Sequence, residues 1–364
     1  MDNLERILLK AEKENSLTID ELYYLFNLSK ERDLNRLFAT ARSLRSKYFG
    51  KKIFLYGFLY LSTWCRNNCN FCYFRKSNSK SVRYRKTAEE IIEAALSLAE
   101  SGVHLIDLTL GEDPFYHNPK GMEVLSDLIG RVKSKTGLSI MVSPGVISEK
   151  SIKMMKDAGA DWYACYQETY NRKLFNVLRP NQSFDQRIFS KYSAVENGLL
   201  IEEGILTGVG ESWFDFLRVI NAISEMQMHQ IRVMSFVPQE GTPMEGLSGP
   251  AVSKELKIIA LFRLLFPDRL IPASLDVEGI KGLKPRIDAG ANVITSLIPP
   301  RIGLAGVAQN KKDINEGWRT VYEVLPILDE MGLQAAFSHE YIKWLKNEME
   351  NLCQKPGKIQ HAEI

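Results

Sequence analysis

The chain has 364 residues, of which 45% are hydrophobic and 25% are charged. This is the composition of a folded globular protein, and it lacks the high charge and low aromatic content of a disordered one. Lysine and arginine exceed aspartate and glutamate by 47 − 44 = 3. So small an excess gives no reason to expect binding to nucleic acid or to an anionic membrane, and we expect a small-molecule substrate.

The N-terminal segment MDNLERILLKAEKENS carries a charge every few residues. It therefore lacks the uninterrupted apolar stretch of a signal peptide or a transmembrane span, and we expect a cytoplasmic protein. Three of the five cysteines fall within eight positions. In a reducing compartment such a group indicates metal binding or catalysis rather than a disulfide framework.

Residues 1–50 are predicted to form a helical extension. The apolar positions of the first helix share one face, Thr18 is a candidate N-cap of a second helix, and a third helical pattern runs up to Gly50.

Short apolar runs rich in β-branched and aromatic residues then alternate with amphipathic helical stretches, which is the pattern of βαβ units around a parallel sheet. Eight such units predict a (β/α)8 TIM barrel over residues 51–310, followed by a C-terminal helical segment and polar tail over residues 311–364. An open doubly wound sheet is the alternative, because counting strands does not prove closure. The runs cover residues 53–60, 104–110, 138–143, 162–168, 199–208, 231–237, 270–276 and 292–298.

A cysteine-rich loop follows the first predicted strand and has the spacing Cys65-x3-Cys69-x2-Cys72. A barrel builds its active site in the loops at the carboxyl ends of its strands. Structural zinc requires four ligands, whereas three cysteines can hold a [4Fe-4S] cluster that keeps one iron open for another ligand. A purely structural or electron-transferring cluster is the alternative, although such clusters normally have four cysteines.

The cysteine spacing, with Phe71 and Tyr73 beside the last cysteine, resembles the signature of the radical S-adenosylmethionine (SAM) superfamily. LTLGEDP resembles the Gly-Glu motif that meets the SAM amino group, which places Glu112 at the cofactor, and VPQEGTPMEG resembles a loop of the biotin synthase-like branch. From about residue 20 to residue 310 the chain resembles the 3-methylornithine synthases of pyrrolysine biosynthesis, notably in LRPNQSFD, EEGILTGVG and IRVMSFVPQEGTP.

The resemblance implies a radical SAM (β/α)8 barrel with a [4Fe-4S] cluster, SAM and an external one-electron reductant. It implies that L-lysine is isomerised to (3R)-3-methyl-D-ornithine through hydrogen abstraction by an adenosyl radical, Cα–Cβ fragmentation and recombination. Another biotin synthase-like enzyme acting on a different small amino acid is the alternative, followed by an iron–sulfur electron-transfer protein.

A zwitterionic diamino substrate needs a cation for its carboxylate and carboxylates or hydroxyls for its amines. Asp107, Arg232, Ser274 and Asp276 provide such a set, and the resemblance assigns them to the substrate. The alternative is that the two aspartates cap turns and that Arg232 is a solvated residue at the start of a strand.

Further residues are expected to contact SAM. Glu168 is a candidate acceptor for the ribose hydroxyls, assisted by Ser143, and Tyr73 is a candidate contact for adenine. Arg179 or Arg187 is expected to pair with the SAM carboxylate. The alternatives are a helix cap for Glu168, surface ions for the arginines and solvent-excluding packing for Tyr73.

Overall fold

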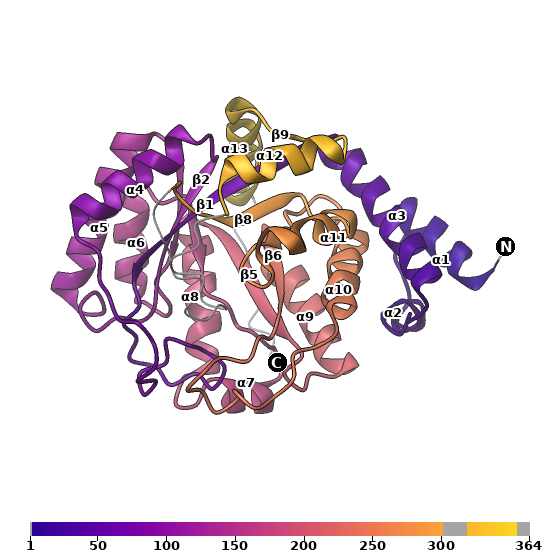
Figure 1. Ribbon diagram of the computed structural model, residues 1–364, viewed down its shortest axis with the longest axis horizontal. Coiled ribbons are helices and arrows are strands. Elements are labelled where there is room, and N and C mark those ends of the chain that lie inside the picture. Colours follow the sequence, from indigo (N-terminus) through magenta and orange to yellow (C-terminus); the bar gives the residue numbers. More distant parts are fainter. Residues whose placement is uncertain (1, 301–318, 355–364) are drawn as a thin grey trace.

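The computed structural model describes residues 2–300 and 319–354 (Figure 1). The predicted boundary between residues 310 and 311 and the predicted polar tail lie outside the described residues. Within them the chain forms a parallel β-barrel surrounded by helices, with the N-terminal helices packed outside the barrel next to α10 and α11 (Figure 1).

Eight parallel strands form the barrel, in the order β6-β5-β4-β3-β2-β1-β8-β7. The ring closes between β6 and β7, where the amide of Ile231 donates to the carbonyl of Leu270 at 2.9 Å and the amide of Leu270 donates to the carbonyl of His229 at 3.1 Å. The predicted barrel is therefore confirmed, and the open doubly wound sheet is wrong. The strands are β1 (Lys52–Ser62), β2 (Leu105–Leu110), β3 (Ser139–Ser143), β4 (Trp162–Ala164), β5 (Leu200–Thr207), β6 (Gln230–Ser235), β7 (Pro272–Ser274) and β8 (Val293–Leu297).

Two strands are shorter than the sequence predicts by four residues each, whereas the other six agree to within two residues at either end. The fourth ends at Ala164 rather than at residue 168, and the seventh covers only Pro272–Ser274. In the fourth unit the backbone leaves the ladder after Ala164 and returns to β5 at Glu168, which bridges Ile205 in a left-handed conformation with φ 66°. Apolar and β-branched composition does not reveal where a strand bends toward a site, so the sequence overestimates both strands.

Each strand-to-strand connection contains at least one helix, as βαβ units require. The apolar faces of these helices pack against the strands in one continuous core. The helices are α4 (Ala88–Glu100), α5 (Pro119–Thr136), α6 (Glu149–Asp157), α7 (Arg172–Leu178), α8 (Phe184–Glu196), α9 (Trp213–Met226), α10 (Val252–Leu265), the 3₁₀ helix η1 (Gly279–Gly282) and α11 (Leu283–Asp288).

Three helices precede the barrel: α1 (Asn3–Glu12), α2 (Ile19–Phe26) and α3 (Glu31–Phe49). Thr18 caps α2 in a capping box with Glu21, as predicted. Helix α3 packs along α10, and β1 begins three residues after α3 ends, close to the boundary expected at residue 50.

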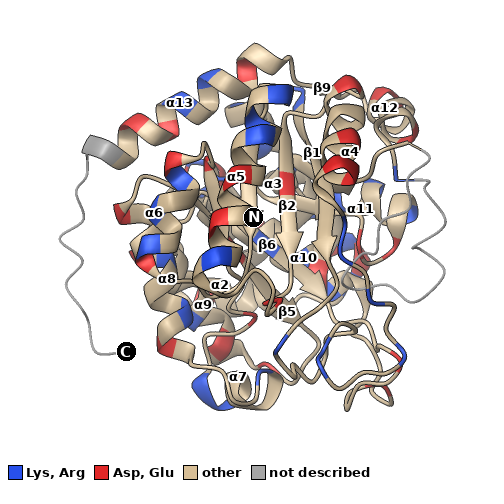
Figure 2. Cartoon of the chain, turned by 90° about the vertical axis from the view of Figure 1, so that its left-hand side faces the viewer, with Lys and Arg blue, Asp and Glu red and all other residues tan. Residues whose placement is uncertain are grey.

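The C-terminal segment contains α12 (Val321–Glu330), the short strand β9 (Gln334–Ala335) and α13 (Ser338–Gln354). Strand β9, which the sequence did not predict, pairs with the start of β1. Helix α13 covers the end of the barrel from which β1 and β2 start, opposite to their arrowheads (Figure 2). Tyr341 and Leu345 of α13 pack against the inward-facing Phe54 and Trp162, so α13 plugs this end of the barrel.

Charged residues of both signs are interspersed along the outer helices (Figure 2). Among the residues that the structure describes, no helix is long and apolar enough to cross a membrane.

The packing of α13 at the closed end predicts that alanine substitutions of two tyrosines differ in their effect on the free energy of unfolding. Tyr341 on α13 is 1% exposed, and its hydroxyl accepts a hydrogen bond from the Trp162 indole at 3.2 Å. Tyr322 on α12 is 65% exposed. We expect Tyr341→Ala to lower the free energy of unfolding by about 3–5 kcal/mol and Tyr322→Ala to change it by less than about 0.5 kcal/mol. Urea denaturation of both variants tests this, and equal midpoints would contradict the plug.

Candidate active site

The cysteine-rich loop begins directly after β1, at the open end of the barrel. Gly111, just after β2, lies beneath it. A Cβ at Gly111 would lie 2.8 Å from the carbonyl oxygen of Trp64 and 2.9 Å from the Cβ of Cys65. Both distances are below van der Waals contact, so this glycine allows the end of β2 to approach the loop.

Two of the three cysteines of this loop, Cys65 and Cys72, lie in an environment that favours the protonated thiol unless a ligand replaces the proton. Burial raises the pKa of the Cys65 thiol, and burial together with Cys69 and Cys65 raises that of Cys72. Two donors reach the Cys69 sulfur, from Gln182 at 3.1 Å and from Arg179 at 3.4 Å. A cluster bound by three thiolates is negatively charged, and such donors stabilise it.

Within the described part of the chain, no three His, Cys, Asp or Glu side chains come close enough together to hold a single metal ion. Ligands of a multi-iron cluster do not have to meet at one point, because each binds a different iron. The chemistry and the place of the three cysteines therefore fit a [4Fe-4S] cluster.

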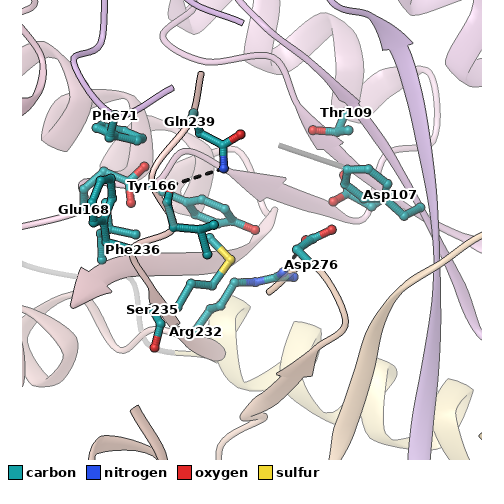
Figure 3. A pocket seen from close by; sticks show the side chains of 14 residues that line it. Phe71, Asp107, Thr109, Tyr166, Glu168, Arg232, Ser235, Phe236, Gln239 and Asp276 are labelled. Carbon is teal, nitrogen blue, oxygen red and sulfur yellow. Dashed lines mark hydrogen bonds and ion pairs between the residues drawn. The ribbon is translucent and has the colours of Figure 1, made fainter. Parts of the chain in front are cut away.

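A cavity of about 100 Å³ lies beside the loop, at the carboxyl ends of the strands (Figure 3). Figure 3 shows Glu168 near Phe71 and Phe236 at one end, Asp107 and Thr109 at the other, and Arg232 beside Asp276. The lining residues are Phe58, Phe71, Asp107, Thr109, Tyr166, Glu168, Leu206, Arg232, Met234, Ser235, Phe236, Val237, Gln239 and Asp276.

The end of the cavity nearest the cysteines contains a buried ion pair. Arg179 donates to Oε1 of Glu168 at 2.5 Å, and its guanidinium lies 5.3 Å from the centre of the Phe71 ring. The other oxygen of Glu168, Oε2, is buried and has no hydrogen-bond partner. Burial raises the pKa of Glu168 despite Arg179. An unpartnered acceptor in this position fits a ligand that carries hydroxyl donors, as the ribose of SAM does.

Glu112 and Arg187 are both buried behind this end of the cavity. Glu112 accepts from Nε of Arg66 at 2.9 Å and from the amide of Val146 at 3.2 Å. Arg187 lies 3.5 Å from Glu112 and donates to Gln182 at 2.9 Å. Because Gln182 donates to the Cys69 sulfur, Arg187 reaches the cysteine loop only through another side chain.

Two further residues expected at the cofactor have protein partners of their own. The hydroxyl of Tyr73 donates to the carbonyl of Lys80 at 2.8 Å, and its ring packs on Phe74. Ser143 donates to Asp107 at 2.8 Å, so it orients a residue of the opposite end of the cavity. Contact of Tyr73 with adenine and of Ser143 with SAM stays a prediction.

The deep part of the cavity is organised by Arg232. Its Nε donates to Oε1 of Glu202 at 2.7 Å across the β5–β6 pair, with side chains that are 5% and 0% exposed. Tyr166 donates to the other oxygen of Glu202 at 2.8 Å. The alternative of a solvated Arg232 is therefore wrong, because the inward face of β6 places the side chain inside the barrel.

Asp276 follows β7 and is held from several sides. Arg319 donates to its Oδ1 at 2.9 Å, and Ser296 donates to its Oδ2 at 2.6 Å. Ser274 donates to Oδ2 at 3.2 Å, and Nη1 of Arg232 lies 4.0 Å from the same oxygen. Burial favours the neutral acid, but Arg319, Ser296 and Arg232 outweigh it and lower the pKa of Asp276. Asp276 is thus an ionised, buried group and not a turn cap.

Asp107 lies in the middle of β2 and is likewise no cap. Burial and the nearby Glu202 raise its pKa to about 7, against the opposing effects of Ser143 and Arg232. At neutral pH this carboxyl is therefore balanced between its two protonation states, and a cationic ligand would draw it to the carboxylate form.

Sequence reasoning missed Glu202, Tyr166 and Arg319, all of which organise this part of the cavity. The signal for Glu202 was an acidic pair inside the apolar predicted strand LLIEEGILTG, since a charge in a buried strand is rare without a partner. Tyr166 lies over Gly204, where a Cβ would lie 2.6 Å from its ring. Arg319 is distant in the chain, and only folding reveals its contact with Asp276.

Comparison with the sequences of known proteins gives three findings. Residues 59–223 match the family model of the radical SAM superfamily. The 3-methylornithine synthase of Methanosarcina barkeri is 42% identical over 92% of this chain and 95% of its own length. The [FeFe] hydrogenase maturase subunit HydE of Thermotoga maritima is 33% identical over 71% of this chain and 74% of its own.

A solved crystal structure of methylornithine synthase has a TM-score of 0.88 and 41% sequence identity, over 93% of this chain and 99% of that one. The agreement covers almost the whole length of both chains. With the cysteine loop and the charged cavity at the open end of the barrel, it shows that the chain belongs to the 3-methylornithine synthase family of the radical SAM superfamily.

Proposed function

We propose that this chain isomerises L-lysine to (3R)-3-methyl-D-ornithine in pyrrolysine biosynthesis. The observation that carries the proposal is a buried set of paired charges next to a three-cysteine loop, at the open end of a barrel. The name of the relative from Methanosarcina barkeri supports the product.

Cys65, Cys69 and Cys72 would hold the [4Fe-4S] cluster, and Glu112, Glu168 and Arg179 would surround SAM. When bound, SAM and the cluster together supply the radical that removes a hydrogen from an unactivated carbon. Oε2 of Glu168 has no hydrogen-bond partner and would accept from the ribose hydroxyls. Arg179 donates both to Glu168 and to the Cys69 sulfur. Arg187 acts as a positioning residue, because it holds Gln182 and Glu112.

The charges of the deep cavity match lysine. Three carboxylates, those of Asp107, Glu202 and Asp276, face the two guanidinium groups of Arg232 and Arg319. With all five ionised the set has a net charge of −3 + 2 = −1, and lysine at neutral pH carries a net charge of +1. Arg232 uses Nε for Glu202 and donates from Nη1 to Ser274 at 3.4 Å, which leaves Nη2, without a hydrogen bond in the described chain, for the substrate carboxylate. The aspartates would accept from the ammonium groups.

The apolar walls of the cavity would serve the fragmentation step. Phe58, Leu206, Met234 and Phe236 contribute to them. Two fragments formed by cleavage of a carbon–carbon bond must stay together and away from water until they recombine. A small cavity between apolar walls restricts both diffusion and solvent access, so the chain supplies containment in addition to charge recognition.

The proposal predicts that substitutions in the charged cavity abolish lysine conversion without preventing cluster assembly. Reconstituted protein with SAM, dithionite and isotopically labelled lysine should form an isomer of the same mass, separable by chromatography, with little 5′-deoxyadenosine. Arg232→Leu and Asp276→Asn should fail to convert lysine, because breaking a buried charge pair costs about 3–5 kcal/mol, or several hundred-fold in affinity.

Both variants should keep the change that SAM causes in the cluster EPR spectrum. Near-normal conversion by the variants would contradict the assignment of these residues. Stoichiometric 5′-deoxyadenosine or a sulfur-containing product would contradict the isomerase.

The cysteine assignment predicts a sharp difference in iron content. Anaerobically reconstituted protein should contain about four irons, and Cys65→Ala, Cys69→Ala or Cys72→Ala should lose most of them. Cys165→Ala is the matched control, since Cys165 is also a buried thiol but lies behind the cavity beside Arg187. Iron analysis and visible absorbance measure the outcome. Retention of the full iron content by any of the three loop variants would exclude that cysteine as a ligand.

The raised pKa of Asp107 predicts that lysine binding depends on pH. With a pKa of about 7 in the free protein, Asp107 takes up a proton as the pH falls through 7 and loses its attraction for an ammonium group. Lysine affinity should therefore decrease below pH 7, approaching about tenfold per pH unit. Equilibrium dialysis between pH 5.5 and 8 should show this slope for the native protein and a flat, weaker profile for Asp107→Asn. Identical slopes would exclude Asp107 as the titrating group.

A further inference from the structure

A second buried ion pair lies outside the cavity, between β5 and α8. Lys191 of α8 donates to Glu203 of β5, and both side chains are 0% exposed. The hydroxyl of Tyr170 donates to the same carboxylate at 2.5 Å. Successive residues of a strand point to opposite faces, so Glu203 points away from the cavity whereas Glu202 points into it. No substrate or cofactor role described above involves this pair.

Stability by itself does not explain these buried charges. Moving two charges out of water is costly, and replacing a buried ion pair by packed apolar side chains is often neutral or stabilising. Ile188 and Ala194, on the same helix as Lys191, belong to the apolar core. Apolar side chains would suit these surroundings, so the retained charges indicate a conformation that only polar partners can hold.

The pair holds Gln167 by its backbone and by its side chain. The amide of Gln167 donates to Oε1 of Glu203 at 2.8 Å, and Nζ of Lys191 donates to Oε1 of Gln167 at 3.1 Å. Gln167 is 0% exposed and lies between Ala164 and Glu168, where the chain is off the strand ladder. A buried amide without an acceptor is costly. Glu203 thus supplies the acceptor that a neighbouring strand supplies elsewhere in the barrel.

The residues on either side of Gln167 both line the cavity (Figure 3). Tyr166 donates to Glu202 in the deep part of the cavity. Glu168 accepts from Arg179 at the end nearest the cysteines. The segment that the ion pair fastens from outside therefore carries one side chain to each end of the cavity.

We infer that Lys191 and Glu203 are positioning residues that set the place of Tyr166 relative to Glu168. The inference rests on the proposed function and deepens it, because it joins the lysine end of the cavity to the SAM end through one short segment. Transfer of a hydrogen between lysine and the cofactor requires the two to be aligned. A misplacement of about 1 Å can cost roughly a hundredfold in rate. The pair lies outside the cavity and acts only through the segment that it holds.

The test compares two neutral double variants that differ in one acceptor. Lys191→Met/Glu203→Gln keeps a side-chain oxygen for the Gln167 amide, whereas Lys191→Met/Glu203→Met removes it. In an anaerobic titration followed by the cluster EPR spectrum, the Glu203→Met double variant should need about tenfold more SAM for half-saturation, because Glu168 is no longer held. Its lysine conversion should fall roughly a hundredfold, with accumulation of 5′-deoxyadenosine. The Glu203→Gln double variant should stay close to the native protein in both measurements.

The matched control removes a pair of the same kind at the start of β4, the opposite end of the barrel. Lys133 donates to Asp161 at 2.8 Å, and Asp161 also accepts from the amide of Ile140 at 3.0 Å. Lys133→Met/Asp161→Met should lower the free energy of unfolding, measured with urea, and leave both SAM affinity and the amount of 5′-deoxyadenosine per product unchanged. The control separates lost positioning from lost stability.

Native SAM affinity and native conversion in the Glu203→Met double variant would overturn the inference. An equal loss in the Lys133→Met/Asp161→Met control, or a Glu203→Met double variant that does not fold, would assign the pair to stability and overturn it as well. Equal losses in the two Glu203 double variants would also do so, because the amide acceptor would then be irrelevant. A native protein that binds SAM but does not convert lysine would instead count against the proposed function, and the SAM titration would still test the inference.

Discussion

The buried ion pair between Arg232 and Glu202 is the interaction on which the open end of the barrel depends. It joins β5 to β6 inside the barrel, with both side chains almost fully buried. Removing either partner would leave an uncompensated charge in a poorly solvated space. Neighbouring groups add further partners to the pair. Tyr166 donates a hydrogen bond to the second oxygen of Glu202, and Asp276 lies beside Nη1 of Arg232.

In the proposed function the same ion pair links the fold to substrate recognition. Because Glu202 accepts from Nε and Ser274 accepts from Nη1, Arg232 is oriented before a ligand arrives and would need little reorganisation to bind a carboxylate. Burial and the nearby Glu202 raise the pKa of Asp107, and the excess of carboxylates over cations would make the cavity attractive to a substrate with a net positive charge. In the proposed function, positioning and selectivity would thus come from one set of buried charges.

The two ends of the barrel have opposite constructions. At the end where the strands start, helix α13 fills the barrel with aromatic side chains. The other end has cysteines, paired charges and irregular backbone, including Glu168 in the left-handed region. Between Ala164 and Glu168 the chain leaves the strand ladder, and it returns to β5 at Glu168, whose side chain lines the cavity beside Arg179.

The sequence alone determined the alternation of eight strands and helices, the helical extension and the three-cysteine loop, because each depends on local periodicity or spacing. It also revealed Asp107, Arg232 and Asp276 as polar residues in or beside apolar strands. Only the tertiary structure decided that the ring closes between His229 and Leu270, because closure joins segments that are far apart in the chain. It alone showed that Arg319 donates a hydrogen bond to Asp276 and that Ser143 donates one to Asp107. It also showed that Glu202 points inward while Glu203 points outward toward α8. These are contacts between distant segments, and a buried charge is explained only by the partner that folding brings to it.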